Sequence, residues 1–150
     1  MISREAFNLS QKIVIPANQS VSLVGVTNGK QIEFVSEDYD ASQGGFEVEF
    51  LEGVTYTGGA QIFGTNRNTT SPAVPTLAIY AGATLSGGQR LRLKGIAQAE
   101  NPQARTRSSS QVVQPWLLDA NKQYALNITN LNSSEITIYA SLEWVEYEML

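Results

Sequence analysis

Apolar and polar side chains alternate along much of the chain, with the period of two that is typical of β-strands. The alternation is clearest in residues 46–50, 124–129 and 136–144, where every second residue is apolar. No stretch follows the 3.6-residue period of a helix for more than two turns. The pattern therefore predicts an all-β protein in which one face of each strand contributes to a hydrophobic core.

Short polar segments rich in glycine, proline, asparagine and serine separate the predicted strands. Asn28-Gly29 lies between the β-rich segments 20–26 and 31–35 and predicts a tight hairpin, because both central residues of a type I′ turn need positive φ. Residues 37–45 and 100–111 are longer polar segments, which we predict to be loops. Eight or more short strands with such turns favour a two-sheet antiparallel β-sandwich, and the jelly roll is the topology we expect.

The first residues of the chain show no clear period, so we predict an N-terminal arm at 1–10 and a single β-sandwich domain at 11–150. A free terminus frays unless something holds it, so the arm packs either on its own domain or on a neighbour. Arg4 and Phe7 are the arm residues that we expect to bind a partner.

The composition limits the chemistry. The chain has no cysteine and no histidine, which excludes disulfides, thiol catalysis and histidine-based metal sites. A net charge of −4 disfavours nucleic acid as a partner. No apolar run approaches the roughly 18 residues of a membrane span, and residues 1–11 lack the apolar region of a signal peptide. We expect a protein that is not an enzyme, has no cofactor or metal and no membrane partner, and is assembled in the cytoplasm.

Two predicted strands carry charge on one face. We expect the acidic and basic faces to pair across neighbouring strands or between subunits, in pairs worth about 0.2 to 1 kcal/mol each. A glycosidase pair of carboxylates is an alternative use of the acidic face, although alternating glutamates usually form a solvated strand face. The candidate subunit-interface residues are Glu47, Glu49, Arg90, Arg92 and Lys94.

The most distinctive segment is 58–70, in which a glycine pair precedes a short strand and a polar loop. Either Asn66 and Asn68 only cap their own backbone, or the loop reaches a partner through Arg67, whose planar guanidinium binds carboxylates and carbonyl groups. The long predicted loop at 100–111 adds two further candidate partner-binding residues, Arg105 and Arg107.

Two other groups of residues have competing interpretations. Glu37, Asp38 and Asp40 carry the oxygen ligands that calcium prefers, but the spacing of an EF-hand loop is missing, which favours an acidic turn. Trp116 and Trp144 lie within apolar segments, which favours positions in the core over platforms for sugar binding.

Several segments together resemble a known family. Gly58-Gly59, the short strand, Asn66-Arg67-Asn68 and the later segments 122–131 and 142–144 are similar to small virion proteins of tailed bacteriophages, of the head decoration or cement type. The likeness extends over roughly residues 45–148. It implies a β-sandwich or jelly roll that binds the major capsid protein on the outer surface of the virion, as a homodimer or homotrimer.

The function that we expect from this resemblance is structural. A capsid decoration protein stabilises the phage head by bridging major capsid subunits, and several weak contacts from one oligomer give avidity. The alternative is a carbohydrate-binding or receptor-binding module of a phage fibre or tail, which would use Trp116 and the loops.

Overall fold

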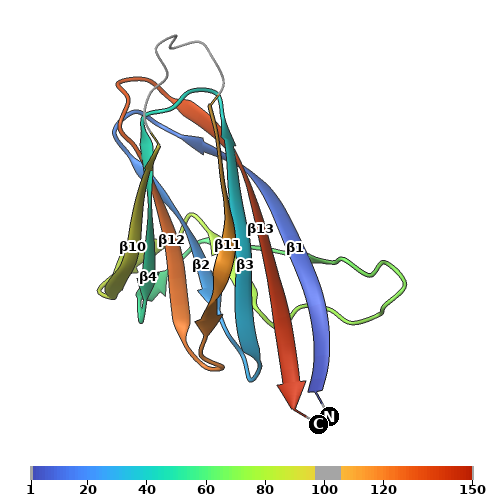
Figure 1. Ribbon diagram of the computed structural model, residues 1–150. Helices are drawn as coiled ribbons and strands as arrows, with labels where there is room; N and C mark the ends of the chain where they lie inside the picture. The colour runs from blue at the N-terminus through green and yellow to red at the C-terminus, as the bar shows by residue number, and fades with distance from the viewer. Residues whose placement is uncertain (1, 97–105, 150) are drawn as a thin grey trace.

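The computed structural model describes residues 2–96 and 106–149, which form two antiparallel sheets packed face to face (Figure 1). The all-β sandwich predicted from the alternating pattern is therefore confirmed. Sheet A has the order β11 (Thr106–Leu118), β3 (Gln31–Ala41), β13 (Ile136–Met149), β1 (Ile2–Ile15) and β7 (Thr65–Asn66). Sheet B has the order β10 (Gln89–Ile96), β4 (Phe46–Glu52), β12 (Gln123–Asn130), β2 (Ser20–Val26), β8 (Ala78–Ala81) and β6 (Ala60–Ile62). A small third sheet pairs β5 (Thr55–Thr57) with β9 (Thr84–Ser86).

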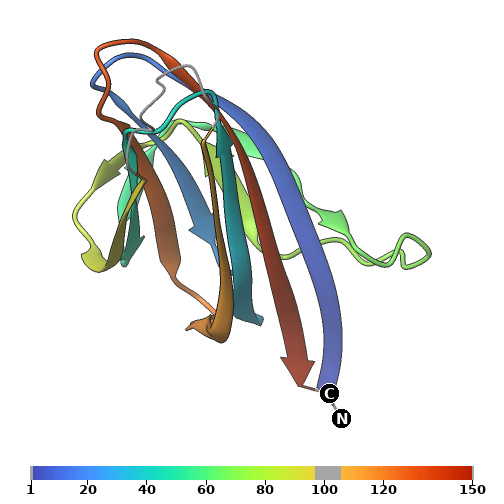
Figure 2. The same ribbon diagram turned by 45° about the horizontal axis from the view of Figure 1, so that its top comes forward.

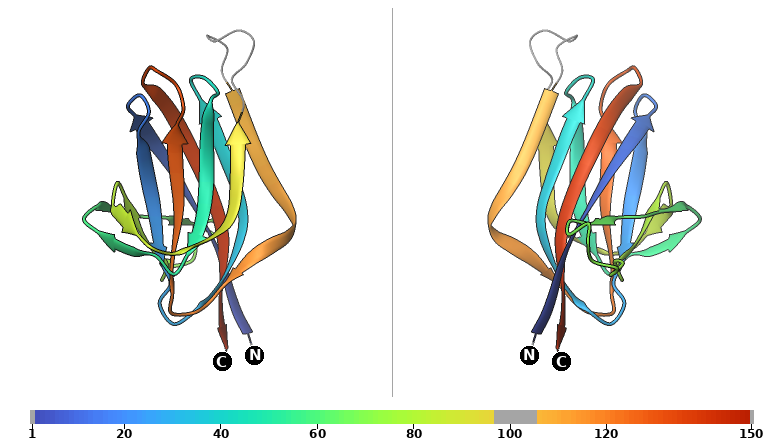
Figure 3. Two further views of the ribbon diagram at one scale, coloured as in Figure 1. Left: turned by 90° about the vertical axis from the view of Figure 1, so that its left-hand side faces the viewer. Right: turned by 90° about the vertical axis from the view of Figure 1, so that its right-hand side faces the viewer.

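The long strands follow the connections of a jelly roll. Along the chain, β1, β2, β3 and β4 alternate between sheets A and B, and β10, β11, β12 and β13 do the same. Only β4 and β10 are successive long strands in one sheet. This double Greek key gives the four-strand orders β11-β3-β13-β1 and β10-β4-β12-β2, which face each other in Figure 3.

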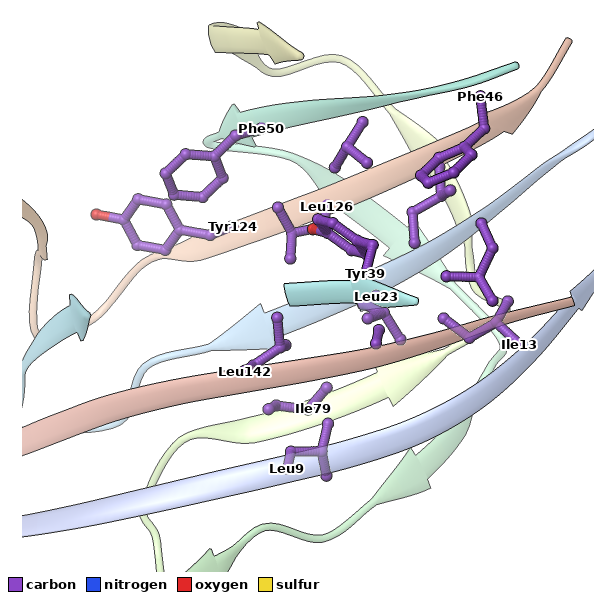
Figure 4. Packing of buried hydrophobic residues seen from close by; sticks show 14 of the residues in the cluster. Leu9, Ile13, Leu23, Tyr39, Phe46, Phe50, Ile79, Tyr124, Leu126 and Leu142 are labelled. Carbon is purple, nitrogen blue, oxygen red and sulfur yellow. The ribbon is translucent and has the colours of Figure 1, made fainter. Parts of the chain in front are cut away.

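The core lies between the sheets and consists of the inward-facing residues of the alternating strands (Figure 4). Phe46, Phe50, Leu126 and Leu142 are buried there, as the period of two predicts. Burying each such side chain stabilises the fold by about 1.5 to 3 kcal/mol. Trp144 is also buried, which confirms its predicted place in the core and removes it as a sugar platform.

The predicted alternation is wrong in β10. A β-bulge between Arg90 and Arg92 adds one residue, so the side chains beyond it change faces. Arg92 and Lys94 lie opposite the inward-facing Phe50 and Val48 of β4, whereas Arg90 lies opposite Leu51. The three basic residues therefore do not share one face, and Leu93, expected in the core from its alternation with them, is 45% exposed.

Arg92 instead bridges the two sheets. Its guanidinium donates a hydrogen bond to the buried carboxylate of Glu37 in β3. The neighbouring Tyr39 is also buried, and this burial raises the pKa of its hydroxyl well above the ordinary value, with the Glu37 charge acting in the same direction. Glu37, Asp38 and Asp40 belong to β3 rather than to the predicted polar loop, so the acidic turn is also wrong.

The predicted N-terminal arm is part of the sandwich. Residues 2–10 are the first part of β1, which pairs with β13 from Ile2 opposite Met149 to Ile15 opposite Ile136. Both termini consequently lie at the same end of the molecule (Figure 1). The period was hard to recognise because polar Glu5 and Gln11 occupy positions in phase with buried Phe7 and Leu9, where the alternation calls for apolar residues.

The hairpin predicted at Asn28-Gly29 is also wrong. Gly29 does adopt positive φ, 80°, but the turn connects β2 in sheet B to β3 in sheet A. Its N–H donates to the carbonyl of Ala120 at 2.7 Å. The local turn signal is therefore correct about Gly29 but wrong about Asn28, which does not adopt positive φ, and wrong about the strands that pair.

Candidate partner-binding loop

The connection between β4 and β10, residues 53–88, covers the side of the sandwich where β1 and β2 lie. Within it, β6 and β8 extend sheet B beyond β2, whereas β7 pairs with β1 in sheet A at Phe7 and Asn8. Between β7 and β8 the chain projects past β1 as a long loop, drawn in green in Figure 2. We call residues 63–77 the edge loop.

A buried carboxylate holds the second half of the edge loop. Glu146, which is 2% exposed, accepts hydrogen bonds from the Thr76 N–H at 2.9 Å, the Thr76 hydroxyl at 2.7 Å and the Leu77 N–H at 3.1 Å. The indole Nε1 of Trp144 donates to the same carboxylate at 3.0 Å. Hydrogen bonds to a charged group are about twice as strong as neutral ones, so Glu146 fixes the loop firmly to β13.

A second carboxylate holds the first half of the loop. Glu5 in β1 accepts from the Asn66 side-chain amide at 3.1 Å and from the Ser71 hydroxyl at 3.2 Å. The Asn66 amide also donates to the Ala73 carbonyl at 3.1 Å. The loop is thereby tied to both strands at this side of sheet A.

The two asparagines cap their own backbone, as one of the predicted interpretations required. The Asn66 side-chain oxygen accepts from the Asn68 N–H at 2.8 Å. The Asn68 side-chain oxygen accepts from the Thr70 N–H at 3.2 Å and the Thr70 hydroxyl at 2.6 Å. These Asx turns set the path of the loop tip.

Arg67 directly follows β7, where its N–H donates to the Ala6 carbonyl of β1 at 2.9 Å, and its side chain reaches Glu143 of β13. Its Nη1 is 2.5 Å from Oε1 of Glu143, and the two side chains are 53% and 41% exposed. An exposed pair of this kind contributes about 0 to 1 kcal/mol, so it is easily exchanged for another partner. The guanidinium has five N–H donors, which leaves donors for a second carboxylate or a carbonyl group.

Gly64 lets the loop approach the core closely. A Cβ at this position would lie 2.5 Å from Cη2 of Trp144, whose ring also stacks on Phe7 with centroids 6.0 Å apart. A larger residue would collide with this buried ring. The glycine at position 64 is therefore needed for space.

The base of the loop exposes apolar groups. Phe63 and Val74 are 75% and 74% exposed. They border an open hollow of ≈ 350 Å³ lined by residues 61–64 and 74–78. Arg67 is the only charged residue in the whole 53–88 connection. This surface thus combines apolar side chains with uncharged polar groups.

The other predicted site residues are dispersed. Phe7 is 1% exposed in the core, so it cannot contact a partner, whereas Arg4 is exposed on β1. Arg105 lies outside the described residues, and Arg107 lies in β11 opposite Asp40. Of these residues, Phe7 lies against the edge loop, because it pairs with Asn66, but its side chain faces the core.

The charged strand faces pair partly within the chain. Arg90 Nε is 2.6 Å from Oε2 of Glu49, which is the expected pairing across neighbouring strands. Glu47 lies opposite Gly95 in β10. A role for these residues between subunits stays a prediction.

The interior offers little room for a ligand. An apolar cavity of ≈ 50 Å³ lies between the sheets beside Phe50 and Trp144, well below the roughly 300 Å³ of small-molecule sites. Trp116 packs edge-on against Phe50 at 5.2 Å between centroids. Among residues 2–96 and 106–149, no three carboxylate, histidine or cysteine side chains gather as a metal site, and no helix is long and apolar enough to cross a membrane.

Comparison of the chain with protein-family models and with curated proteins found no match. The sequence interpretation missed Glu146, Glu5, Gly64, Phe63 and Val74 as parts of the site. One signal was present, because Glu146 continues the apolar face of residues 136–144 and a charge there needs a buried partner. Phe63 gave a weaker signal as a single aromatic residue in a glycine-rich polar segment.

Proposed function

We propose that the protein is a structural virion protein that decorates the outside of a tailed-phage head and stabilises it by bridging major capsid subunits. The observation that supports this function best is the edge loop, which projects beyond β1 while buried Glu146 and half-buried Glu5 hold it to sheet A. The resemblance of residues 58–70 and the later segments to decoration proteins favours the same function.

The anchoring suits a binding loop. Ordering a flexible loop costs about 1 to 2 kcal/mol for each residue whose backbone is fixed on binding. In the edge loop most of that cost falls on folding, because carboxylates and Asx turns already fix the backbone. A contact made through Arg67, whose backbone is bonded to β1, then retains more of its interaction energy, and several copies on one shell add avidity.

The test uses heads assembled from the major capsid protein encoded in the same genome. Purified full-length chain is added to empty heads, binding is followed by co-sedimentation, and shell disruption is followed by heating. Arg67→Ala should weaken binding at least about tenfold, the effect of losing one contact of about 1.4 kcal/mol. A ligand that binds only the intact shell raises its disruption temperature by mass action.

Arg90→Ala is the matched control. Arg90 has nearly the same exposure as Arg67, 54% against 53%, and also makes one surface ion pair, but it lies on β10. Its replacement should leave head binding unchanged. Heads that neither bind the wild-type chain nor gain heat resistance from it would refute the decoration role, and equal losses for both variants would remove the edge loop as the contact.

A further inference from the structure

Phe63 and Val74 form an exposed apolar patch on a well-anchored segment. The two side chains are 75% and 74% exposed, and both line the ≈ 350 Å³ hollow at the base of the edge loop. Neighbouring positions face inward, since Ile62 packs on the core and Gly64 touches Trp144. Phe63 directly follows β6, and its side chain lies on the surface between these two positions.

Charge indicates what covers this patch. The 53–88 connection has a single charged residue, Arg67, which is paired with Glu143. The chain as a whole has a net charge of −4, so a second copy brings the same negative charge to any contact. An uncharged surface is where two such copies approach with the least repulsion. A strongly charged partner would find no unpaired group of opposite charge on this surface.

The shape of the patch also fits a copy of itself. A contact between identical surfaces needs a projecting group and a receiving hollow within one patch. Phe63 and the hollow beside it provide both. Large aromatic side chains that fill a pocket in the partner are the usual centres of binding energy in protein interfaces.

We propose that residues 61–64 and 74–78 form the contact between two copies of this chain, with Phe63 of each copy entering the hollow of the other. This inference deepens the proposed function, on which the role of the association rests. It assigns subunit contact to the base of the edge loop and leaves Arg67, beside β1, for the capsid. The proposed subunit contact therefore differs from the one expected from the sequence, which used the charged faces of β4 and β10. On those strands Arg90 pairs with Glu49 within one chain.

Sedimentation of the purified chain over a concentration series tests the proposal. The wild type should associate, and Phe63→Ser should raise the dissociation constant at least about 30-fold, as loss of a central aromatic contact does. Val74→Ser should weaken association less, because valine is smaller. Leu131→Ser is the control, since Leu131 is 56% exposed in the turn between β12 and β13 and should have no effect. Thermal unfolding at a concentration where every chain is monomeric should be the same for all four proteins.

Salt and hydrogen exchange identify the surface independently. Association through an apolar patch should persist in about 1 M salt, where the Debye length is about 3 Å. Backbone amides of 61–64 and 74–78 should become protected as concentration rises. A chain that stays monomeric, an equal effect of Leu131→Ser, or dissociation by salt would overturn the proposal. Because these measurements need no capsid, their failure leaves capsid binding through Arg67 to its own test.

Discussion

Replacing Glu146 with glutamine tests how the edge loop is held. The carboxylate is 2% exposed and accepts from the Thr76 N–H, the Thr76 hydroxyl, the Leu77 N–H and the indole of Trp144. Glutamine keeps the size but turns one acceptor oxygen into an NH₂ donor and removes the charge. In the best orientation the glutamine NH₂ faces the Thr76 groups. Its side-chain oxygen still accepts hydrogen bonds from the Leu77 N–H and the Trp144 indole, but these are now hydrogen bonds to a neutral group.

The expected loss is about 2 to 4 kcal/mol in the free energy of unfolding, because hydrogen bonds to charged groups contribute about 1.5 to 3 kcal/mol and neutral ones about 0.5 to 1.5. Urea unfolding measures the global change, and hydrogen exchange measures opening of residues 64–77. The control is Glu143→Gln, which removes a 41% exposed partner of Arg67 and should cost less than about 1 kcal/mol. A Glu146→Gln protein with wild-type stability and unchanged exchange in the loop would refute the anchoring role.

Two further substitutions test the packing. Gly64→Ala should destabilise the protein by about 1 to 3 kcal/mol in thermal unfolding, because the new Cβ would lie 2.5 Å from the buried ring of Trp144. The control Gly95→Ala, whose Cβ would have no atom within 4 Å, should be neutral or slightly stabilising. Equal effects of the two substitutions would argue against the close contact at Gly64. Arg92→Met should lower the free energy of unfolding in urea by about 3 to 5 kcal/mol, because the buried Glu37 carboxylate loses its cation. Adding Glu37→Leu to this variant should recover most of the loss. An Arg92→Met protein as stable as the wild type would contradict the ion pair between the sheets.

The same features protect the sheet edges. A free edge strand presents unpaired backbone groups that template pairing with other chains. On β10 the bulge and the inward-pointing Arg92 disrupt a regular edge. On β1 the edge loop covers part of the edge, where the Arg67 N–H donates to the Ala6 carbonyl at 2.9 Å.

The alternating pattern was sufficient to predict the fold class and most of the core. Each strand of a sandwich has one face toward the other sheet, so the distribution of apolar residues within a few positions reveals its inner face. Phe46, Phe50, Leu126 and Leu142 could be placed in this way, and the caps made by Asn66 and Asn68 could be foreseen, because both depend on residues close in sequence.

The site depends on contacts that the sequence does not reveal locally. Glu146 binds Thr76 across 70 residues, and Arg92 binds Glu37 across 55, so neither pairing exists until the sheets have packed. Asn28-Gly29 shows the same limit, since a turn fixes its own backbone but the strands that follow choose partners by burial in the whole sandwich. One bulged residue in β10 was enough to exchange the inner and outer faces of Arg92 and Leu93, because side chains in a strand alternate with a period of two.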